Sequence, residues 1–249
     1  ERGLPLAKLD VFCSTCVEKG VSSVDNSLPV WEDRSISDIS DILLGFEYSE
    51  LDFYASDICS KFKFSKKENC LTEKVSLLPS EYAVFDFSRN VSGFFSLKVK
   101  VLQDAEIYLT FDELDLKDED NCNTDGVNVC FYRNACCNII YWKAKKGEYT
   151  LTAIEPNTAR FARVLSLGGA IECSLEMVLF QNDMMYNLQF NSEDEQLNAI
   201  VKSAQHSLAQ NSVDCLIDCP SRERAGWYND SWFTMEGEKI LIGNVLANK

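Results

Sequence analysis

The sequence has little histidine, no surplus of basic charge and no long apolar run. Only one of the 249 residues is histidine, and 39 Asp and Glu against 24 Lys and Arg give a net charge of −15. This charge argues against nucleic acid as a partner, because a phosphate backbone binds to a basic surface. No stretch reaches the roughly 18 apolar residues that a membrane-spanning helix needs, so no membrane partner is expected.

The two ends also lack ordinary terminal signals. ERGLPLAKLD has neither an initiator methionine nor a charged-then-apolar signal segment, and ILIGNVLANK has no helix-ending pattern. We therefore expect a segment of a longer protein. The eleven cysteines are odd in number and scattered, and Cys13-Ser-Thr-Cys16 has no second CxxC, which argues against a disulfide framework, a zinc site or another metal centre. The cytoplasm is the expected compartment, with secretion or the periplasm as the alternative if a signal was lost by truncation. No cofactor is expected.

Residues 1–185 are predicted to form one or more β-sandwich domains. Apolar and polar residues alternate in four segments, as they do in strands with one buried face. The predicted inward-facing sets are Phe95, Leu97, Val99 and Val101; Ile107, Leu109 and Phe111; Cys137, Ile139 and Tyr141; and Tyr149, Leu151 and Ala153. Glycines at 93, 147, 168 and 169 mark predicted turns. Residues 35–54 could hold a short helix, and 114–126 are predicted to be a polar loop.

The pattern changes to helical near residue 190. Ser192 and Glu195 have the capping-box spacing, and apolar residues then recur at helical spacing, which predicts a helix from about 193 to 210. Its predicted apolar stripe is Leu197, Ile200, Val201, Ala204 and Leu208. A second helix is predicted from about Ser231, with Trp232 and Phe233 in its core. Residues 186–249 are thus predicted to begin a helical domain.

Between these two helices, residues 218–230 read DCPSRERAGWYND. Pro220 and Gly226 prevent a continuous helix, so the charged side chains must project from a loop. Carboxylates at Asp218 and Asp230 can accept hydrogen bonds from sugar hydroxyls, Arg222 can donate to a hydroxyl or a carboxylate, and Trp227 offers an apolar face. Like charges and an aromatic wall favour the protonated form of a glutamic acid such as Glu223, as a general acid requires. Composition alone favours a salt-bridged surface loop over a site.

The thirteen residues resemble the active-site signature D-x-P-x-R-E-R-x-G-W-x-G-D of the bacterial α-L-rhamnosidases, glycoside hydrolase family 78. Asn229 stands where that family usually has glycine. FDFSRNVSGFFSLKV resembles a strand pair of the family's β-sandwich, with Ser88 at a common glycine position, and residues 190–220 resemble the first helix of its (α/α)₆ catalytic barrel. The resemblance implies a multidomain β + α fold, in which a jelly-roll-like β-sandwich precedes the first helices of a truncated (α/α)₆ barrel.

The resemblance also implies the chemistry: hydrolysis of terminal α-L-rhamnosides, on a rhamnosylated glycan or glycoside, with inversion. Glu223 would be the general acid, Asp218 and Asp230 would bind hydroxyls with help from Arg222, and Trp227 would pack against the ring. No residue here matches the family's general base, and neither Glu236 nor Glu238 is expected to serve, so this segment alone is expected to be inactive. A six-hairpin glycosidase for another sugar and a non-catalytic carbohydrate-binding module stay open as alternatives. His206 is expected at a helix surface or interface.

Overall fold

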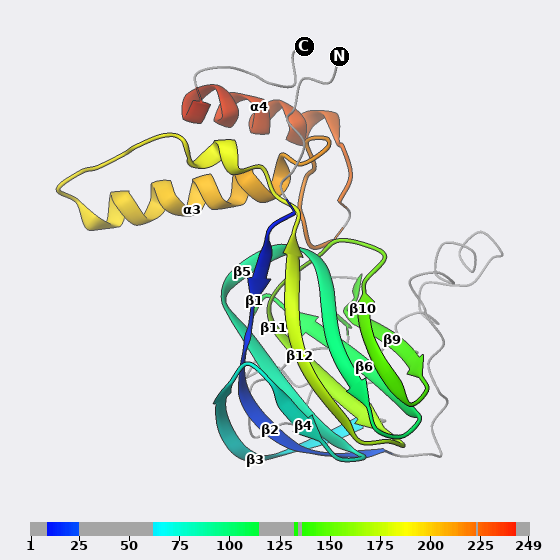
Figure 1. Cartoon of the computed structure of the whole chain (residues 1–249). Coiled ribbons are helices and arrows are strands. Elements are labelled where there is room, and N and C mark those ends of the chain that lie inside the picture. Colours follow the sequence, from blue (N-terminus) through cyan, green and yellow to red (C-terminus); the bar gives the residue numbers. More distant parts are fainter. Residues whose placement is uncertain (1–8, 25–61, 115–131, 134–135, 223, 243–249) are drawn as a thin grey trace.

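The computed structural model describes residues 9–24, 62–114, 132–133, 136–222 and 224–242. Figure 1 shows a β-sandwich with two helices set across one of its ends. The strands are β1 (Val11–Cys13), β2 (Thr15–Val24), β3 (Phe62–Thr72), β4 (Val75–Leu77), β5 (Glu81–Val101), β6 (Ala105–Asp112), β7 (Tyr132–Arg133), β8 (Cys136–Cys137), β9 (Ile139–Ala144), β10 (Gly147–Thr152), β11 (Asn157–Leu167) and β12 (Ile171–Leu179). A 3₁₀ turn, η1 (Asp183–Tyr186), then leads to α3 (Glu195–Asn211) and α4 (Tyr228–Ile242). In the described parts of the chain, no helix is long and apolar enough to cross a membrane.

The long strand β5 joins the two layers of the sandwich. Its first half pairs with β2 and β11, and its second half pairs with β12 and β10. One layer therefore runs β3-β2-β5-β11-β6-β9, and the other consists of β12, β5 and β10 with β1 and β4 at the edge. The strand pairs are antiparallel, so the predicted sandwich of short strands agrees with the structure, apart from the unexpected length of β5.

The core between the layers confirms most of the predicted alternation. Phe95, Leu97, Val99 and Val101 are buried on β5, while the intervening Lys98 and Lys100 are exposed. The predicted inward set of β6 is buried as well. Each such large apolar side chain stabilises the fold by about 1.5–3 kcal/mol on burial. These strands therefore supply much of the force that holds the sandwich together.

The predicted inward face of β9 is only partly right: Ile139 is buried, but Tyr141 is not, and the side chain of Cys137 lies outside the described residues. Ile140 and Trp142 pack against the core, whereas Tyr141 is 42% exposed and contacts the ring of Tyr108 at 4.9 Å between centroids. Both sides of this strand carry large apolar residues, so the alternation in the sequence does not show which side faces inward. On β10, Leu151 and the following Ala153 pack inward as predicted, but Tyr149 is partly exposed.

Gly93 does not form the predicted turn, because it lies inside β5. A Cβ on Gly93 would come within 2.1 Å of the Val178 carbonyl oxygen of β12, so glycine is needed there for close approach of two strands. The β11–β12 connection does turn at Gly168 and Gly169, as predicted, with Gly168 at a φ of 82°. The helix predicted within 35–54 and most of the loop at 114–126 lie outside the described residues.

The helices begin at residues other than those predicted. The N-cap of α3 is Asp194, whose carboxylate accepts hydrogen bonds from the Gln196 and Leu197 amides, while the Ser192 hydroxyl accepts one from the Asp194 amide. The prediction of Ser192 as the N-cap is therefore wrong by two residues, because Asp194 is an equally good N-cap residue. The second helix, α4, starts at Tyr228 rather than Ser231.

The predicted apolar stripe of α3 is not buried in the described structure. Its buried side chains are Gln205, Ala209 and Gln210, at the end that crosses the sandwich, while Ile200 is 64% exposed (Figure 1). On α4, Trp232 and Phe233 are exposed as well, so their predicted place in a helical core is wrong for the described residues. The two helices contact each other at Gly237, where a Cβ would meet the Leu208 side chain at 2.9 Å.

Candidate active site

The loop between α3 and α4 is closed into a ring by reciprocal hydrogen bonds. The Asp218 amide donates to the Ala225 carbonyl oxygen at 3.0 Å, and the Ala225 amide donates to Asp218 Oδ1 at 2.9 Å. The Cys219 thiol donates to Asp218 Oδ2 at 3.3 Å. A carboxylate can accept about four hydrogen bonds, so Asp218 keeps capacity for a ligand hydroxyl while it closes the loop. The predicted sugar-binding role of Asp218 is compatible with this geometry.

Arg224 anchors the ring to the sandwich. Its guanidinium donates through Nη1 to the Pro156 carbonyl oxygen and through Nη2 to Glu155 Oε2 at 2.7 Å, and both acceptors lie in the β10–β11 connection. Arg224 has a φ of 52°, a left-handed conformation that costs a non-glycine residue about 1–2 kcal/mol. The charge-assisted contacts of the side chain therefore offset a backbone conformation that is unfavourable by itself.

A second hydrogen bond joins the same loop to the sandwich at Pro220. The Thr158 hydroxyl donates to the Pro220 carbonyl oxygen at 2.8 Å, so it must accept from the Ser92 hydroxyl, 2.7 Å away. Thr158 and Ser92 are both buried. The sandwich thus holds the loop at Pro220 and at Arg224, on either side of the charged segment. The sequence gives no signal for the contacts at Glu155, Pro156 and Thr158, which lie more than 60 residues away from the loop.

The remaining predicted site residues lie at or near the start of α4. Trp227 is 57% exposed and directly precedes the helix, and Asp230 is exposed in its first turn. Among the described residues, no hydrogen bond or ion pair joins Asp218 to either of them. Asn229 adopts helical geometry in α4, so the position does not need the positive φ that glycine would permit. Arg222 is exposed on the turn, and Glu223 lies outside the described residues.

His206 lies at the junction between α3 and the sandwich. Its Nε2 is 2.6 Å from the Asn90 carbonyl oxygen, so Nε2 carries the hydrogen and donates it to that acceptor. Its Nδ1 is 2.8 Å from the Tyr186 hydroxyl, and Gln210 also donates to the Asn90 oxygen at 3.2 Å. These contacts agree with the interface role predicted for His206. They also tie α3 to the middle of β5, close to the point where β5 passes between layers.

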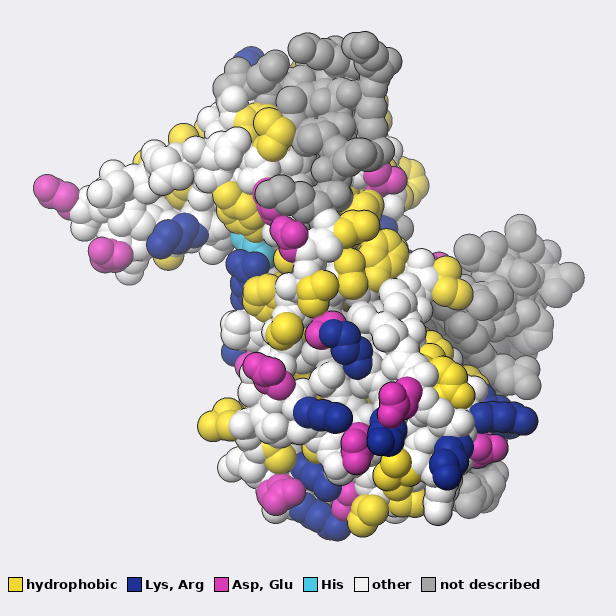
Figure 2. Space-filling view, in the orientation of Figure 1, with side chains coloured by type: hydrophobic (Ala, Val, Ile, Leu, Met, Phe, Trp, Pro, Cys, Tyr) yellow, Lys and Arg dark blue, Asp and Glu magenta, His cyan; other side chains and the backbone are white. Residues whose placement is uncertain are grey.

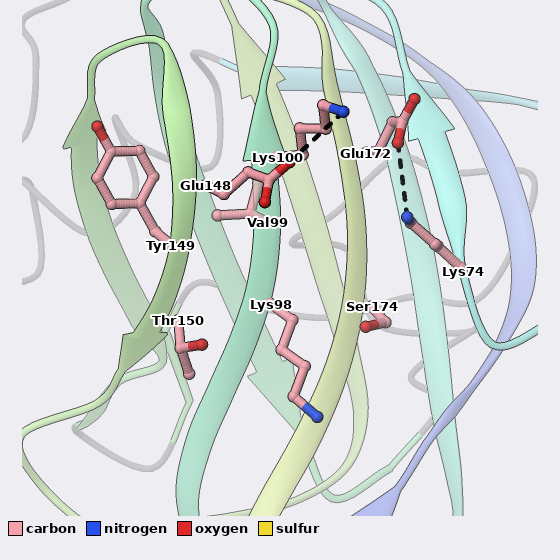
Figure 3. Close-up of a pocket in the computed structure, with 9 residues that line it drawn as sticks. All are labelled: Lys74, Lys98, Val99, Lys100, Glu148, Tyr149, Thr150, Glu172 and Ser174. Atoms are coloured by element: carbon pink, nitrogen blue, oxygen red, sulfur yellow. Dashed lines mark ion pairs between the residues drawn. The ribbon is translucent and has the colours of Figure 1, made fainter.

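A shallow hollow of about 530 Å³ lies elsewhere, on the outer face of the second layer. Figure 3 shows that lysines and glutamates line it as ion pairs: Lys74 with Glu172, and Lys100 with Glu148, each at 3.5 Å. Lys98 pairs with Glu176 at 2.6 Å. None of the residues 218–230 lines this hollow. Figure 2 shows basic and acidic side chains intermingled over the visible sheet face, so the hollow has no charge of one sign to attract a ligand.

The described cysteines do not assemble a metal site. Cys13 is exposed on β1, whereas Cys16 is buried on β2, and no group of three potential ligands gathers within the described ranges. Burial, together with the neighbouring Cys70 thiol, raises the pKa of Cys16 to about 12, and burial raises the pKa of Cys173 to about 12. Both thiols therefore stay protonated and act as small apolar side chains.

Comparison with known proteins finds similarity to the bacterial α-L-rhamnosidases. Residues 187–246 match the family model of the bacterial alpha-L-rhamnosidase 6 hairpin glycosidase domain. An alpha-L-rhamnosidase of Formosa agariphila is 28% identical over 173 residues, covering 67% of this chain and 18% of that protein. One from Alteromonas sp. (strain LOR) is 30% identical over 160 residues, covering 59% of this chain and 16% of that protein. The chain is thus similar to bacterial α-L-rhamnosidases over the matched stretches. It spans less than a fifth of the length of these two curated α-L-rhamnosidases.

Solved α-L-rhamnosidase structures share its fold. A GH78 family rhamnosidase of Bacillus sp. GL1 superimposes with a TM-score of 0.58 at 17% identity, over 67% of this chain and 17% of that one. A rhamnosidase from Klebsiella oxytoca with rhamnose bound gives a TM-score of 0.53 at 12% identity, over 88% of this chain and 38% of that one. The predicted fold class, a β-sandwich followed by the first helices of the α-L-rhamnosidase barrel, is confirmed. The division at residues 185 and 186 stays a prediction.

Proposed function

We propose that the protein carrying this chain is an inverting α-L-rhamnosidase that hydrolyses terminal α-L-rhamnosides. The observation that carries the proposal is the family match over 187–246, which includes the whole DCPSRERAGWYND loop. The geometry supports it, because the loop is closed at Asp218 and anchored to the sandwich, while Trp227 and Asp230 stay accessible to a ligand. A non-catalytic binding module would not need such a fixed acidic loop.

In this proposal Glu223 is the general acid that protonates the departing glycosidic oxygen. Asp218 and Asp230 accept hydrogen bonds from hydroxyls of the sugar, Arg222 assists them, and Trp227 packs against the ring. Inversion requires a second carboxylate that activates water from the opposite face, about 6.5–9.5 Å from the acid. We place that base beyond residues 1–249. Glu238 of α4 is fully buried, which makes it a poor candidate for a group that must reach water.

The decisive experiment measures glycoside hydrolysis by the full-length protein and its Glu223→Gln variant. We expect cleavage of an aryl α-L-rhamnoside by the wild type, with proton NMR showing that the sugar first released has the inverted, β, anomeric configuration. Removing a general acid typically lowers the rate by about 10²–10⁴-fold, so Glu223→Gln should nearly abolish cleavage of substrates with poor leaving groups. An unchanged circular dichroism spectrum would show that the variant folds.

A panel of other aryl glycosides serves as the control for specificity. Preferential cleavage of a different sugar would replace rhamnose while keeping the six-hairpin glycosidase assignment. Rhamnose binding by a protein that cleaves none of the panel would instead indicate a binding module. Full turnover by the Glu223→Gln variant would remove Glu223 from the acid role.

A further inference from the structure

The acid-bearing loop is fixed by the sandwich rather than by the helical unit alone. The ring from Asp218 to Ala225 closes on itself through its own backbone and the Asp218 carboxylate. That closure sets the shape of the ring, while its position relative to the sandwich requires a contact between the two. Arg224, next to Glu223 in sequence, supplies such a contact to the sandwich.

The acceptors of Arg224 suit a rigid two-point attachment. One guanidinium edge reaches the Pro156 carbonyl and the Glu155 carboxylate together. A planar guanidinium holds two acceptors at a fixed angle, which a lysine ammonium on a flexible stem cannot reproduce. The Glu155 side chain is 67% exposed, so this ion pair contributes little to global stability. Its effect is local and concerns where the loop is held.

The Thr158 hydroxyl adds a second, buried attachment at Pro220. Since Thr158 and Ser92 sit on adjacent strands β11 and β5, the loop rests on the sheet itself and not on a loose turn. Pro220 and Arg224 flank the charged segment from both sides. Two attachments on either side of a short segment define its position far better than one.

We propose that the β10–β11 connection of the sandwich positions the catalytic loop, with Arg224 as the positioning residue and Glu155 and Thr158 as its supports. This inference rests on the proposed function, because it takes the loop to bear the general acid. The sandwich is then part of the catalytic apparatus and not an independent accessory domain. Arg224 touches neither substrate nor reacting atoms in this role.

The proposal predicts an effect on kcat that depends on the leaving group. Misplacing a catalytic group by about 1 Å can cost about 10²-fold in rate. A substrate with a poor leaving group, such as an alkyl α-L-rhamnoside, depends on proton donation, whereas 4-nitrophenyl α-L-rhamnoside depends on it far less. Arg224→Lys should therefore lower kcat for the alkyl substrate by roughly 10- to 100-fold and for the nitrophenyl substrate by less than about 3-fold. KM should change little, because the Asp218–Ala225 ring closes without Arg224.

The experiment compares Arg224→Lys, Glu155→Gln and Thr158→Val in the full-length protein with both substrates. Glu172→Gln is the matched control, since it breaks an ion pair to Lys74 on the outer sheet face, away from the loop. Thermal unfolding of each variant checks that the fold persists. A double-mutant cycle of Arg224→Lys with Glu155→Gln should be non-additive, because both changes break the same contact.

The outcomes separate this inference from the proposed function. Selective loss on the alkyl substrate in Arg224→Lys and Glu155→Gln, with Glu172→Gln unchanged, supports positioning by the sandwich. Equal loss on both substrates indicates a role in folding only and overturns the inference, as does wild-type behaviour of Arg224→Lys. If Glu223→Gln also keeps full activity, Glu223 is not the general acid, and if the wild type cleaves no aryl glycoside, the proposed function itself fails.

Discussion

At the scale of single residues, three described non-glycine residues, Ser80, Ser88 and Arg224, have positive φ, and the last two lie where the path of the chain requires this strained conformation. Arg224 lies in the loop, and Ser88, at a φ of 63°, lies in β5 where the strand passes from one layer to the other. The Ser88 amide donates to Asp86 Oδ1 at 2.6 Å, which stabilises the bend locally. Glycine adopts this conformation without a Cβ penalty.

Ser88→Gly should therefore leave the protein as stable as the wild type or slightly more so. The αL conformation costs a residue with a Cβ about 1–2 kcal/mol, and the greater chain entropy of glycine in the unfolded state offsets part of that gain. Ser88→Ala is the matched control, because it removes the hydroxyl but keeps the Cβ. Urea unfolding should rank the glycine variant about 1 kcal/mol above the alanine variant. The reverse ranking would show that Ser88 is not strained.

The Glu81 carboxylate contacts groups from several parts of the sandwich, and the stability that these contacts contribute depends on pH. Burial alone would raise its pKa, but the Leu78 amide, Lys19 and Lys67 stabilise its charged form and lower the pKa below the usual 4.5. The Leu78 amide donates to it at 2.9 Å, and Lys19 lies 2.9 Å away. A depressed folded-state pKa contributes stability above the unfolded pKa, and this contribution is lost as the pH falls through the folded value.

Wild type and Glu81→Gln should consequently differ most in unfolding free energy near neutral pH and converge on acidification below about pH 4.5. Urea unfolding at a series of pH values measures the difference. Glu148→Gln, which removes an exposed partner of Lys100, is the control and should show almost no such trend. A constant gap between wild type and Glu81→Gln down to acid pH would contradict the depressed pKa.

At the scale of elements, β5 is the strand on which both layers and the helical junction depend. It pairs with β2, β10, β11 and β12. Its Asn90 carbonyl oxygen accepts hydrogen bonds from His206 and Gln210 of α3. Gly93 lets β5 and β12 approach closely at the point where this strand enters the second layer. The position of α3 thus follows from the path of β5.

Gly93→Ala should destabilise the sandwich, because the new Cβ would lie 2.1 Å from the Val178 carbonyl oxygen, which is fixed in the backbone of β12. Forcing atoms into such a packed site costs about 1–3 kcal/mol or more. Ser174→Ala on the outer face of β12 is a control expected to stay within about 0.5 kcal/mol of wild type. Thermal unfolding monitored by circular dichroism compares the two, and a Gly93→Ala variant as stable as wild type would refute the close approach.

At the scale of the whole molecule, the helical unit is only partly covered. Ile200 of α3 and Phe233 and Ile240 of α4 are between 64% and 75% exposed, although each belongs to an apolar pattern typical of packed helices. Exposed apolar surface of this kind marks a contact area. Under the proposed function, further helices of a six-hairpin glycosidase domain, whose family model residues 187–246 match, would cover this surface.

Under the proposed function, residues 1–249 produced alone should show no hydrolase activity, whereas the full-length protein should cleave an aryl α-L-rhamnoside. The general base would be absent, which alone costs about 10²–10⁴-fold, and most of the substrate cavity would be absent too. Nitrophenol release by both proteins at equal concentration tests this. Comparable rates would mean that the site is complete within these residues.

The sequence by itself determined that a strand-rich part precedes a helical part, and it marked the loop between the two helices. Alternation in β5 and β6, the helical period after residue 194 and the DCPSRERAGWYND signature are local properties that survive in any folded context. Local pattern did not decide which face of β9 turns inward, because both faces carry large apolar residues. It also missed the N-cap at Asp194, where neighbouring cap residues compete.

Only the tertiary structure decided how the loop is held. Arg224 is visible in the sequence as part of a motif, but its partners Glu155 and Pro156, and the Thr158–Pro220 contact, join residues more than 60 positions apart. Likewise, Gly93 has the appearance of a turn residue until β12 is brought against it. Such contacts arise from the packing of strands and helices that are distant in sequence, so no local pattern encodes them.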